Sequence, residues 1–534
     1  MQQVLSRYFT SDITFRMLSW LMFGAFVFPI LTAQSFTTLD GPGHIHNANI
    51  IHSLLFDSDH AWAPYVELNT FVSPNLLGHY LLLMVIQIVG EQNGDRVMAV
   101  LCMASLFFAL RYLLRALKVD RIMLLLPLCF LLNTPLFSGF FSFMLGLAAM
   151  FVSTGYFVRL RDIMWKNPMP VRQSGALALL LVVTYLLHLV PAVLACLFIA
   201  IAFLTDVFQR RHEHDWKIDL LWKPSRVALF AALPVSILVV LYQLHDSETG
   251  QYAFVESKEL LRQWGVMQGL IINNRNEWAF TRWYWIAPAA ALLIDIVWLK
   301  LKPNAVQIKT QDPAALPMLL SMLMVLGALY FIMPDASSGG GALSVRLNFL
   351  LVLFSVIVLF MHMRTALMRF IACAALVIVV FDHRNKVLAY HEEHGFFMRD
   401  ILELNTEFDK PGVLLVHRFR YDWPFEHCTK YLGINQQIVH VDALGGHKIY
   451  APVTWKPALR NQPDLVAMFD KGWQQDPQNW LRFFPGEQVY VLAIGNPSPA
   501  DSTTWTKWQD FMQLRSAVET WSSDSVMHVY AFEQ

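Results

Sequence analysis

The feature that most constrains this chain is a succession of uncharged apolar segments, each about as long as a membrane is thick. Of its 534 residues, 56% are hydrophobic and only 15% are charged, and the mean hydropathy is +0.43. A soluble fold of this length could not bury so much apolar surface. A helix of about 20 apolar residues, in contrast, crosses the hydrocarbon core of a bilayer. The sequence therefore predicts a polytopic α-helical membrane protein.

We expect about eleven transmembrane helices. Their approximate limits are residues 16–35, 96–116, 121–137, 139–159, 174–190, 192–208, 225–243, 283–300, 314–333, 346–362 and 366–381. The first segment is too long for the apolar core of a signal peptide and lacks a cleavage site, so we expect it to remain as an anchor. The apolar segment 75–90 is short, and we interpret it as a helix on the membrane surface.

The distribution of Lys and Arg predicts the orientation, because cytoplasmic loops collect these residues. With segment 75–90 on the surface, the basic stretches all fall on one side of the membrane, at residues 111–121, 159–172, 210–226, 300–309 and 364–369. Residues 36–95, which fall on the opposite side, contain no Lys or Arg at all. We therefore predict a cytoplasmic N-terminus and an outer C-terminal region, with residues 383–386 as the one basic cluster that departs from the rule.

Two domains are predicted. Residues 1–381 form the transmembrane domain, which includes a first outer loop with surface helices at 36–95. Residues 382–534 form an extracytoplasmic α/β domain, because 412–416 and 488–493 resemble buried strands and 501–517 resembles a helix. The formal net charge is zero, which gives no basis for a nucleic-acid partner.

A short polar motif follows the first apolar segment, and its first ionisable residue is Asp40. With Pro42 behind it, Asp40 is typical of a helix N-cap, and a helix is expected over residues 43–56. A catalytic role and a purely capping role are equally compatible with this spacing. His44 and His46 point to different helix faces, which disfavours a mononuclear metal site. These histidines could instead hydrogen-bond lipid headgroups or substrate hydroxyls.

Further polar residues in this loop are candidates for substrate binding. Asn47 belongs to the same motif as Asp40, and Asn75 and His79 stand at the start of the surface helix. Asn75 could orient a substrate or simply cap that helix.

A cationic set is also predicted on the outer side. Arg346 opens a span just after the glycine-containing stretch 337–341, and an Arg at membrane depth suits phosphate binding through paired hydrogen bonds. The alternative is an Arg that reaches towards lipid headgroups at a helix end. Lys258 and Arg262, in the neighbouring outer loop, could add to an anion site.

Three ionisable residues lie near the ends of predicted spans. His188 precedes Pro191 at an outer end, where an ionisable side chain is a candidate for function, although a lone histidine beside a helix-breaking turn is more often structural. Asp206 and Asp295 lie near cytoplasmic ends and need only reach water or a neighbouring Lys.

The arrangement resembles that of the GT-C superfamily, the integral membrane glycosyltransferases that include protein O-mannosyltransferases, the lipid A aminoarabinose transferase and the catalytic subunit of oligosaccharyltransferase. The segment Asp40-Gly41-Pro42-Gly43-His44 is similar to the Asp-Gly-Pro-Ala-His motif of a bacterial branch of predicted membrane proteins. Residues 74–79, 188–191 and 340–346 also look like that branch. Two features depart from the superfamily pattern: residues 133–141 contain no acidic residue, and Asp40 has no paired acidic neighbour. No cofactor is therefore predicted, and a divalent metal lacks the support of a paired acidic motif.

The resemblance implies transfer of a hexosyl or pentosyl group from a polyprenyl phosphate or diphosphate carrier to a lipid, glycan or protein acceptor. The reaction would take place at the outer face of a bacterial inner membrane. Asp40 would act as the general base or orient the acceptor hydroxyl, and His44 would hold the sugar or the acceptor. Arg346, helped by Lys258 or Arg262, would stabilise the charge on the departing lipid phosphate.

Two other classes of protein remain open. A lipid or polysaccharide transporter or flippase would also be polytopic, but repeated halves or charges at mid-membrane would be expected. A noncatalytic envelope assembly protein would account for the outer domain and leave Asp40 and Arg346 without a role.

Overall fold

The computed structural model describes the chain except for residues 1–11, 35, 58–61, 167–170, 211–217, 246–251, 274, 303–311, 337–340, 406–407, 409, 420–424, 435–437, 441–450, 461–487, 496–501, 523–526 and 534. Contacts divide the chain into two units. The first consists of Met1–Ala33 and Met98–Tyr390, and the second of Gln34–Val97 and His391–Gln534. The first outer loop is thus grouped with the C-terminal region, a division that differs from the predicted one at residue 381.

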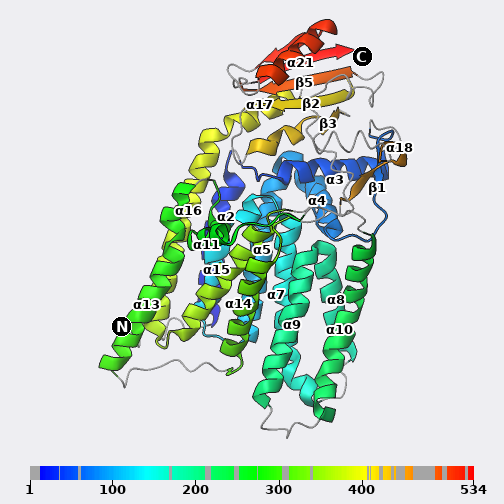
Figure 1. The fold of residues 1–534 in the computed structure, drawn as a ribbon. Helices are drawn as coiled ribbons and strands as arrows, with labels where there is room; N and C mark the ends of the chain where they lie inside the picture. The colour runs from blue at the N-terminus through cyan, green and yellow to red at the C-terminus, as the bar shows by residue number, and fades with distance from the viewer. Residues whose placement is uncertain are drawn as a thin grey trace. The chain divides into compact units, whose positions relative to one another are not determined.

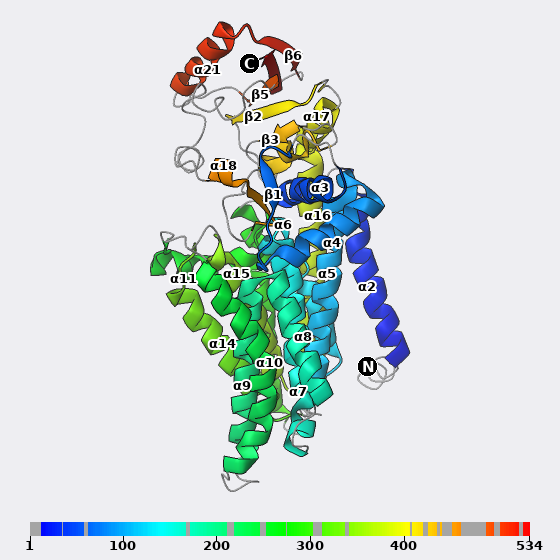
Figure 2. The same cartoon turned by 90° about the vertical axis from the view of Figure 1, so that its right-hand side faces the viewer.

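The first unit is helical (Figures 1 and 2). Its elements are α2 (Asp12–Thr32), α5 (Glu91–Ala116), η1 (Ile122–Phe130), α6 (Thr134–Phe137), α7 (Phe141–Lys166), α8 (Val171–Leu187), α9 (Leu189–Arg210), α10 (Ile218–His245), α11 (Ser257–Gly265), η2 (Gln268–Leu270), η3 (Arg275–Glu277), α12 (Trp278–Thr281), α13 (Trp283–Leu301), α14 (Ala315–Ile332), α15 (Leu343–His362) and α16 (Ala366–His394). Helix α7 packs against α8 and α9, α8 packs against α10, and α14 packs against α15. Both α5 and α16 continue into the second unit.

Within the described residues, nine helices are long and apolar enough to cross a membrane, so the prediction of a polytopic α-helical membrane protein is confirmed. Helix α8 is also apolar but shorter, with 17 residues. The predicted span at 121–137 is not one continuous helix. It consists of the 3-10 helix η1, which contains Pro127, and of α6, which Asn133 caps by accepting a hydrogen bond from the Leu136 amide at 2.9 Å. Proline and a capping side chain interrupt an α-helix, which an apolar count does not register.

The last predicted span, 366–381, continues as helix α16 to His394. Residues 383–386 therefore belong to a helix rather than to the start of a polar tail. His383 Nε2 lies 2.9 Å from Glu277 Oε2, and Arg384 donates to the backbone oxygen of Ala25 at 2.6 Å. Two residues of this basic cluster, His383 and Arg384, therefore have partners inside the first unit.

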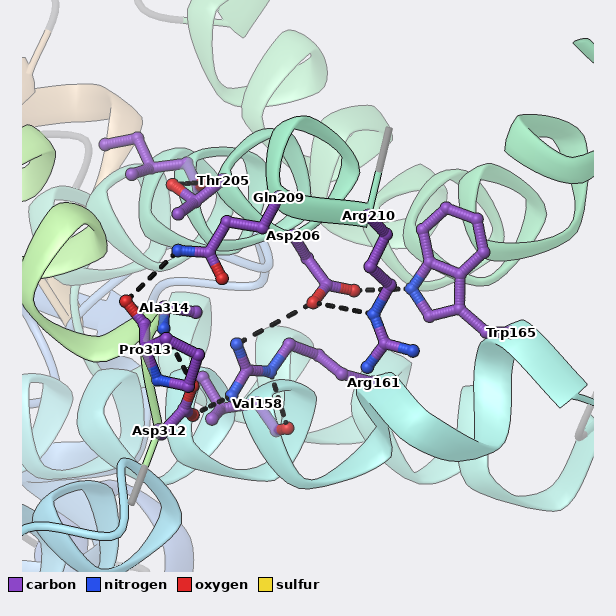
Figure 3. Close-up of polar contacts among 11 residues, drawn as sticks. Val158, Arg161, Trp165, Thr205, Asp206, Gln209, Arg210, Asp312, Pro313 and Ala314 are labelled. Atoms are coloured by element: carbon purple, nitrogen blue, oxygen red, sulfur yellow. Dashed lines mark hydrogen bonds and ion pairs between the residues drawn. The ribbon is translucent and has the colours of Figure 1, made fainter. Parts of the chain in front are cut away.

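Buried ion pairs join the ends of α7 and α9 to the segment before α14 (Figure 3). Arg161 pairs with Asp312 and lies 3.8 Å from Asp206, whose carboxylate also accepts from Arg210 at 3.3 Å and from the Trp165 indole. Asp206 is therefore buried, and among the described residues its ion-pair partners are the arginines Arg161 and Arg210 rather than a lysine. Asp295 is similar, since it accepts from the Arg364 amide at 2.6 Å and from the Thr365 hydroxyl.

The second unit contains a five-stranded mixed sheet in the order β3-β2-β5-β7-β6. Its strands are β2 (Gly412–Arg418), β3 (Ile438–His440), β5 (Gln488–Ile494), β6 (Val518–Ser522) and β7 (Met527–Glu533). Strand β2 is parallel to β3 and β5, and β7 is antiparallel to β5 and β6. Because β2 and β5 are buried along almost their whole length, the two strands predicted at 412–416 and 488–493 are confirmed. The predicted helix at 501–517 is α21 (Ser502–Leu514).

The remaining elements of this unit tie the first outer loop to the C-terminal region. They are α3 (Gly41–Phe56), β1 (Val66–Leu68), α4 (Leu76–Val89), α17 (Phe396–Leu404), η4 (Phe425–Tyr431), β4 (Val453–Trp455) and α18 (Pro457–Arg460). Strands β1 and β4 pair antiparallel, with Val66 opposite Trp455. Helix α3 packs against both α4 and η4. A segment from residues 425–431 is thereby held beside the polar motif of the first loop.

Candidate functional site

Asp40 precedes α3 but does not cap it. Its backbone is helical, with φ −92° and ψ −7°, and its side chain makes no capping hydrogen bond. The carboxylate instead accepts a hydrogen bond from Nδ1 of His427 in η4, at 2.8 Å. The capping interpretation of Asp40 is therefore wrong, and its charge is available for another role.

The turn that holds Asp40 is built by Thr38 and Asp95. Asp95 accepts hydrogen bonds from the Thr38 amide at 2.6 Å and from its hydroxyl at 2.9 Å, and the Thr38 hydroxyl in turn accepts from the Gly41 amide at 3.1 Å. A Cβ at Gly41 would overlap both the Asp95 carboxylate and the Thr38 hydroxyl. Glycine is required at this position because no side chain fits between the turn and α5.

Positive groups surround the Asp40 carboxylate. A Cβ at Gly43 would lie 3.1 Å from Cδ of Lys430, so this second glycine allows the Lys430 side chain to approach α3. Burial raises the pKa of Asp40, but the hydrogen bond from His427 and the charges of His44, His427 and Lys430 outweigh it and hold the pKa below its ordinary value of 3.8. Asp40 is consequently an ionised carboxylate at neutral pH.

A hydrogen-bonded chain connects His44 to the start of α4. His79 Nδ1 donates to the Asn75 carbonyl at 3.0 Å, which leaves Nε2 of His79 as an acceptor. Nδ1 of His44 lies 3.1 Å from that atom and must be the donor. Burial, followed by the nearby His44, lowers the pKa of His79 to about 3, so His79 stays neutral and fixes the tautomer of His44. The structure therefore brings together Asp40, His44, Asn75 and His79, with Asn75 in the left-handed region at φ 74°.

The other polar residues of α3 face elsewhere. His46 is buried and donates to the Lys430 carbonyl at 3.0 Å, and His52 lies 3.9 Å from Asp57. The different faces of His44 and His46 agree with the helical spacing. Asn47 is half-buried, three positions after His44, and no hydrogen bond of its side chain is found among the described residues.

A second group of predicted residues meets in the first unit. A guanidinium nitrogen of Arg346, at the start of α15, lies 3.5 Å from Nε2 of His188, in the turn between α8 and α9. The Arg346 guanidinium also stacks 4.1 Å from the centre of the Phe140 ring. Gly146 allows this approach, because a Cβ there would lie 3.2 Å from Cβ of His188.

The hydrogen-bond donors of Arg346 and His188 are arranged in a way that suits an anion. The Val190 amide donates to Nδ1 of His188 at 3.2 Å, so that atom carries no proton and the proton of a neutral ring is on Nε2. Arg346 has only donors to offer. Two donors therefore face one another, and an acceptor oxygen such as that of a phosphate would satisfy both.

Lys258 and Arg262 lie on α11, which packs against α14 and α15. Arg262 is exposed and forms an ion pair with Glu259 through two donors, one of them at 2.6 Å. Lys258 is exposed. Among the described residues, no hydrogen bond joins Lys258 or Arg262 to Arg346 or His188. Their part in an anion site stays a prediction. Residues 337–340 of the glycine-containing stretch lie outside the described residues.

His427 and Lys430 were not predicted from the sequence. Both come from a short 3-10 helix far along the chain, and no spacing rule connects residues 387 positions apart. In the described part of the chain, no group of three or more His, Cys, Asp or Glu side chains is arranged to hold a metal ion. Asp40 belongs to the second unit and Arg346 to the first.

No protein-family model matches the chain, and no curated protein matches its sequence. Solved structures do resemble it. ArnT from Cupriavidus metallidurans bound to undecaprenyl phosphate is 13% identical, with 97% of each chain covered and a TM-score of 0.46. The oligosaccharyltransferase of Archaeoglobus fulgidus tethered to an acceptor peptide is 10% identical, with 98% of this chain and 74% of that chain covered and a TM-score of 0.45. At these values the likeness assigns no role to any residue.

Proposed function

We propose that the protein is a membrane glycosyltransferase of the GT-C type. It transfers a sugar from a polyprenyl-phosphate or polyprenyl-diphosphate carrier to an envelope acceptor. The observation that carries this proposal is the Asp40 carboxylate, which is ionised, does not cap its helix and is oriented by His427 at 2.8 Å. A purely structural acidic residue at this position would be expected to bond the first turn of α3.

The chemistry assigned to Asp40 is activation of the acceptor hydroxyl. Oδ1 of Asp40 accepts from His427, and within the described residues no hydrogen bond is recorded for Oδ2. This second oxygen is suited to accept the acceptor proton as the new bond forms between the acceptor oxygen and the anomeric carbon. His44, whose tautomer is fixed by His79, supplies polar contact to the sugar or the acceptor.

The chemistry assigned to Arg346 and His188 is stabilisation of the leaving group. When the bond between the anomeric carbon and the phosphate oxygen breaks, negative charge grows on the lipid phosphate. A guanidinium and an imidazole N–H that face one another at 3.5 Å suit that charge. Phe140, against which the guanidinium stacks, holds the planar group in orientation.

The test is complementation of cells that lack the gene, with mass spectrometry of envelope glycolipids and glycoproteins as the readout. Asp40→Asn keeps the size of the side chain and removes the base, so we expect the sugar-modified product to disappear while the protein accumulates normally in the membrane. Asp57→Asn is the matched control, because Asp57 is an exposed carboxylate at the other end of α3. A full level of product with Asp40→Asn would remove Asp40 from the mechanism, and identical envelope profiles with and without the gene would refute the transferase.

A further inference from the structure

A cavity of about 300 Å³ opens in the first unit, away from Arg346 and His188 in sequence. It is lined by Phe15, Arg16, Arg115, Arg121 and Leu124. These residues come from the first turns of α2, the last turn of α5 and the entry to η1. Three of the five lining residues are therefore arginines, contributed by three separate elements.

A fourth arginine lies beside the cavity. Arg111 is only 6% exposed, and its guanidinium stacks 4.9 Å from the ring centre of Phe107 and 5.8 Å from that of Phe15. Arg115 and Arg16 lie within electrostatic range of this buried charge. Like charges held together in a medium of low dielectric constant repel one another and favour an anion between them.

Among the described residues, none of the ion pairs includes Arg16, Arg111 or Arg115. Asp120, which directly precedes Arg121 in the chain, is paired with Arg369 and accepts a hydrogen bond from the Ile122 amide at 2.9 Å.

The surroundings of the cavity suit an amphipathic anion better than a soluble one. On α2, Ile13 is 71% exposed and Met17 is 60% exposed, on either side of Arg16. Helix α2 as a whole is among the less buried candidate spans, with 33% of its apolar window buried. Guanidinium groups beside an uncovered apolar helix face match a phosphate headgroup that carries acyl chains.

We propose that this cavity binds the phosphate of an anionic phospholipid through Arg16, Arg115 and Arg121, with the acyl chains along the apolar face of α2. The proposal concerns the end of the bundle at which the basic stretches gather, and it stands independently of the glycosyl transfer. Each guanidinium donates paired hydrogen bonds to phosphate oxygens, and the negative charge of the bound lipid offsets the repulsion between the arginines and Arg111.

The experiment is native mass spectrometry of the full chain released from nanodiscs that contain equal amounts of palmitoyl-oleoyl phosphatidylglycerol and phosphatidylcholine. We expect phosphatidylglycerol to be retained preferentially by the unsubstituted protein. The combined variant Arg16→Gln, Arg115→Gln, Arg121→Gln should lose that preference by about ten-fold or more. A matched control, Arg172→Gln, Lys300→Gln, Arg364→Gln, removes three exposed charges that do not line the cavity and should retain it.

Two further measurements separate the sources of the phosphate and guard against misfolding. Inorganic diphosphate is titrated against the lipid-bound protein, and we expect it not to displace phosphatidylglycerol at millimolar concentration. Complete displacement would overturn the lipid assignment in favour of a soluble phosphate. The charge-preserving variant Arg16→Lys, Arg115→Lys, Arg121→Lys should keep part of the preference. Equal retention of both lipids by the unsubstituted protein, or equal loss in the control, would overturn the proposal.

Discussion

Nδ1 of His427 donates a hydrogen bond to Oδ1 of Asp40 at 2.8 Å, although 387 positions separate the two residues. The carboxylate that the sequence motif singles out is therefore positioned by the C-terminal part of the chain. Lys430, in the same 3-10 helix, adds a positive charge close to it. The C-terminal region thus contributes two residues of η4, His427 and Lys430, to the surroundings of Asp40.

His427→Asn should shift the pH dependence of Asp40. In the folded protein the pKa of Asp40 lies below its ordinary value of 3.8, with burial opposing and the His427 hydrogen bond leading the groups that lower it. The stabilisation of the ionised form is present above the ordinary pKa and is lost as pH falls through the lower folded value. Without His427 the pKa rises, because burial is no longer outweighed to the same extent. Product formation measured from pH 3 to 7 should show its acid limb moved to higher pH.

The control for this change is His52→Asn, because His52 lies 3.9 Å from the carboxylate of Asp57, at the other end of α3 from Asp40. It should leave the acid limb where it is. If the acid limb is unchanged in the His427→Asn variant, His427 does not control the pKa of Asp40.

The helical membrane class was predictable from the sequence because spans are a matter of length and apolar composition. The strands at 412–416 and 488–493 were predictable for the same reason, since continuous apolar runs of this length mark buried strands. The interruption of segment 121–137 was not predicted, because it depends on where Pro127 and the capping Asn133 fall within an apolar run.

The candidate site was predictable only in part. The motif indicated Asp40 and His44, and the helix start indicated Asn75 and His79, because each lies close to a recognisable local signal. His427 and Lys430 carry no such signal, and their approach depends on the packing of η4 against α3. The glycines of the motif are a clue in retrospect: Gly41 meets Asp95 and Gly43 meets Lys430, so both mark close approaches.

Gly41→Ala should destabilise the protein and abolish product formation. The added methyl group overlaps the Asp95 carboxylate and the Thr38 hydroxyl, and overpacking of this kind costs about 1–3 kcal/mol. Thermal unfolding of the purified protein should show a lower Tm. Gly24→Ala is the control, since nothing lies within 4 Å of a Cβ at that position in α2, and it should be neutral or slightly stabilising. Equal behaviour of the two variants would contradict the close fit of Gly41.

Arg346→Lys should weaken binding of the lipid-linked donor even though the charge is kept. Lys lacks the planar fork that faces His188 at 3.5 Å and stacks on Phe140, and a lost bidentate contact to phosphate corresponds to about a ten-fold rise in KM. Arg262→Gln is the comparison, because Arg262 is exposed and already paired with Glu259. Its effect should stay within about two-fold. Similar KM values for the two variants would remove the special role of Arg346.

Acidification should destabilise the second unit through His46. Burial lowers the pKa of His46 to about 4, against 6.5 for an exposed histidine. Between these values the unfolded chain binds a proton that the folded protein excludes, so stability falls as pH decreases from about 6.5 to 4, by on the order of 3 kcal/mol. His46→Asn, which can still donate to the Lys430 carbonyl, should flatten the dependence of Tm on pH in this range. A parallel slope in the variant would show that His46 is protonated in the folded state.

Asp206→Asn should be among the most damaging single changes in the first unit. Arg161 and Asp206 are 8% and 6% exposed, and the substitution leaves two guanidinium groups, those of Arg161 and Arg210, without the charge that they share (Figure 3). Removing one member of a buried ion pair costs about 3–5 kcal/mol, whereas an exposed pair contributes about 0–1 kcal/mol. Glu259→Gln, which breaks the exposed pair with Arg262, is the matched comparison in thermal unfolding. We expect a larger fall in Tm for Asp206→Asn, because water is excluded from the buried ion pairs of Arg161 and Asp206. Equal, small falls in Tm for the two variants would contradict this and would mean that water reaches Arg161 and replaces the lost carboxylate.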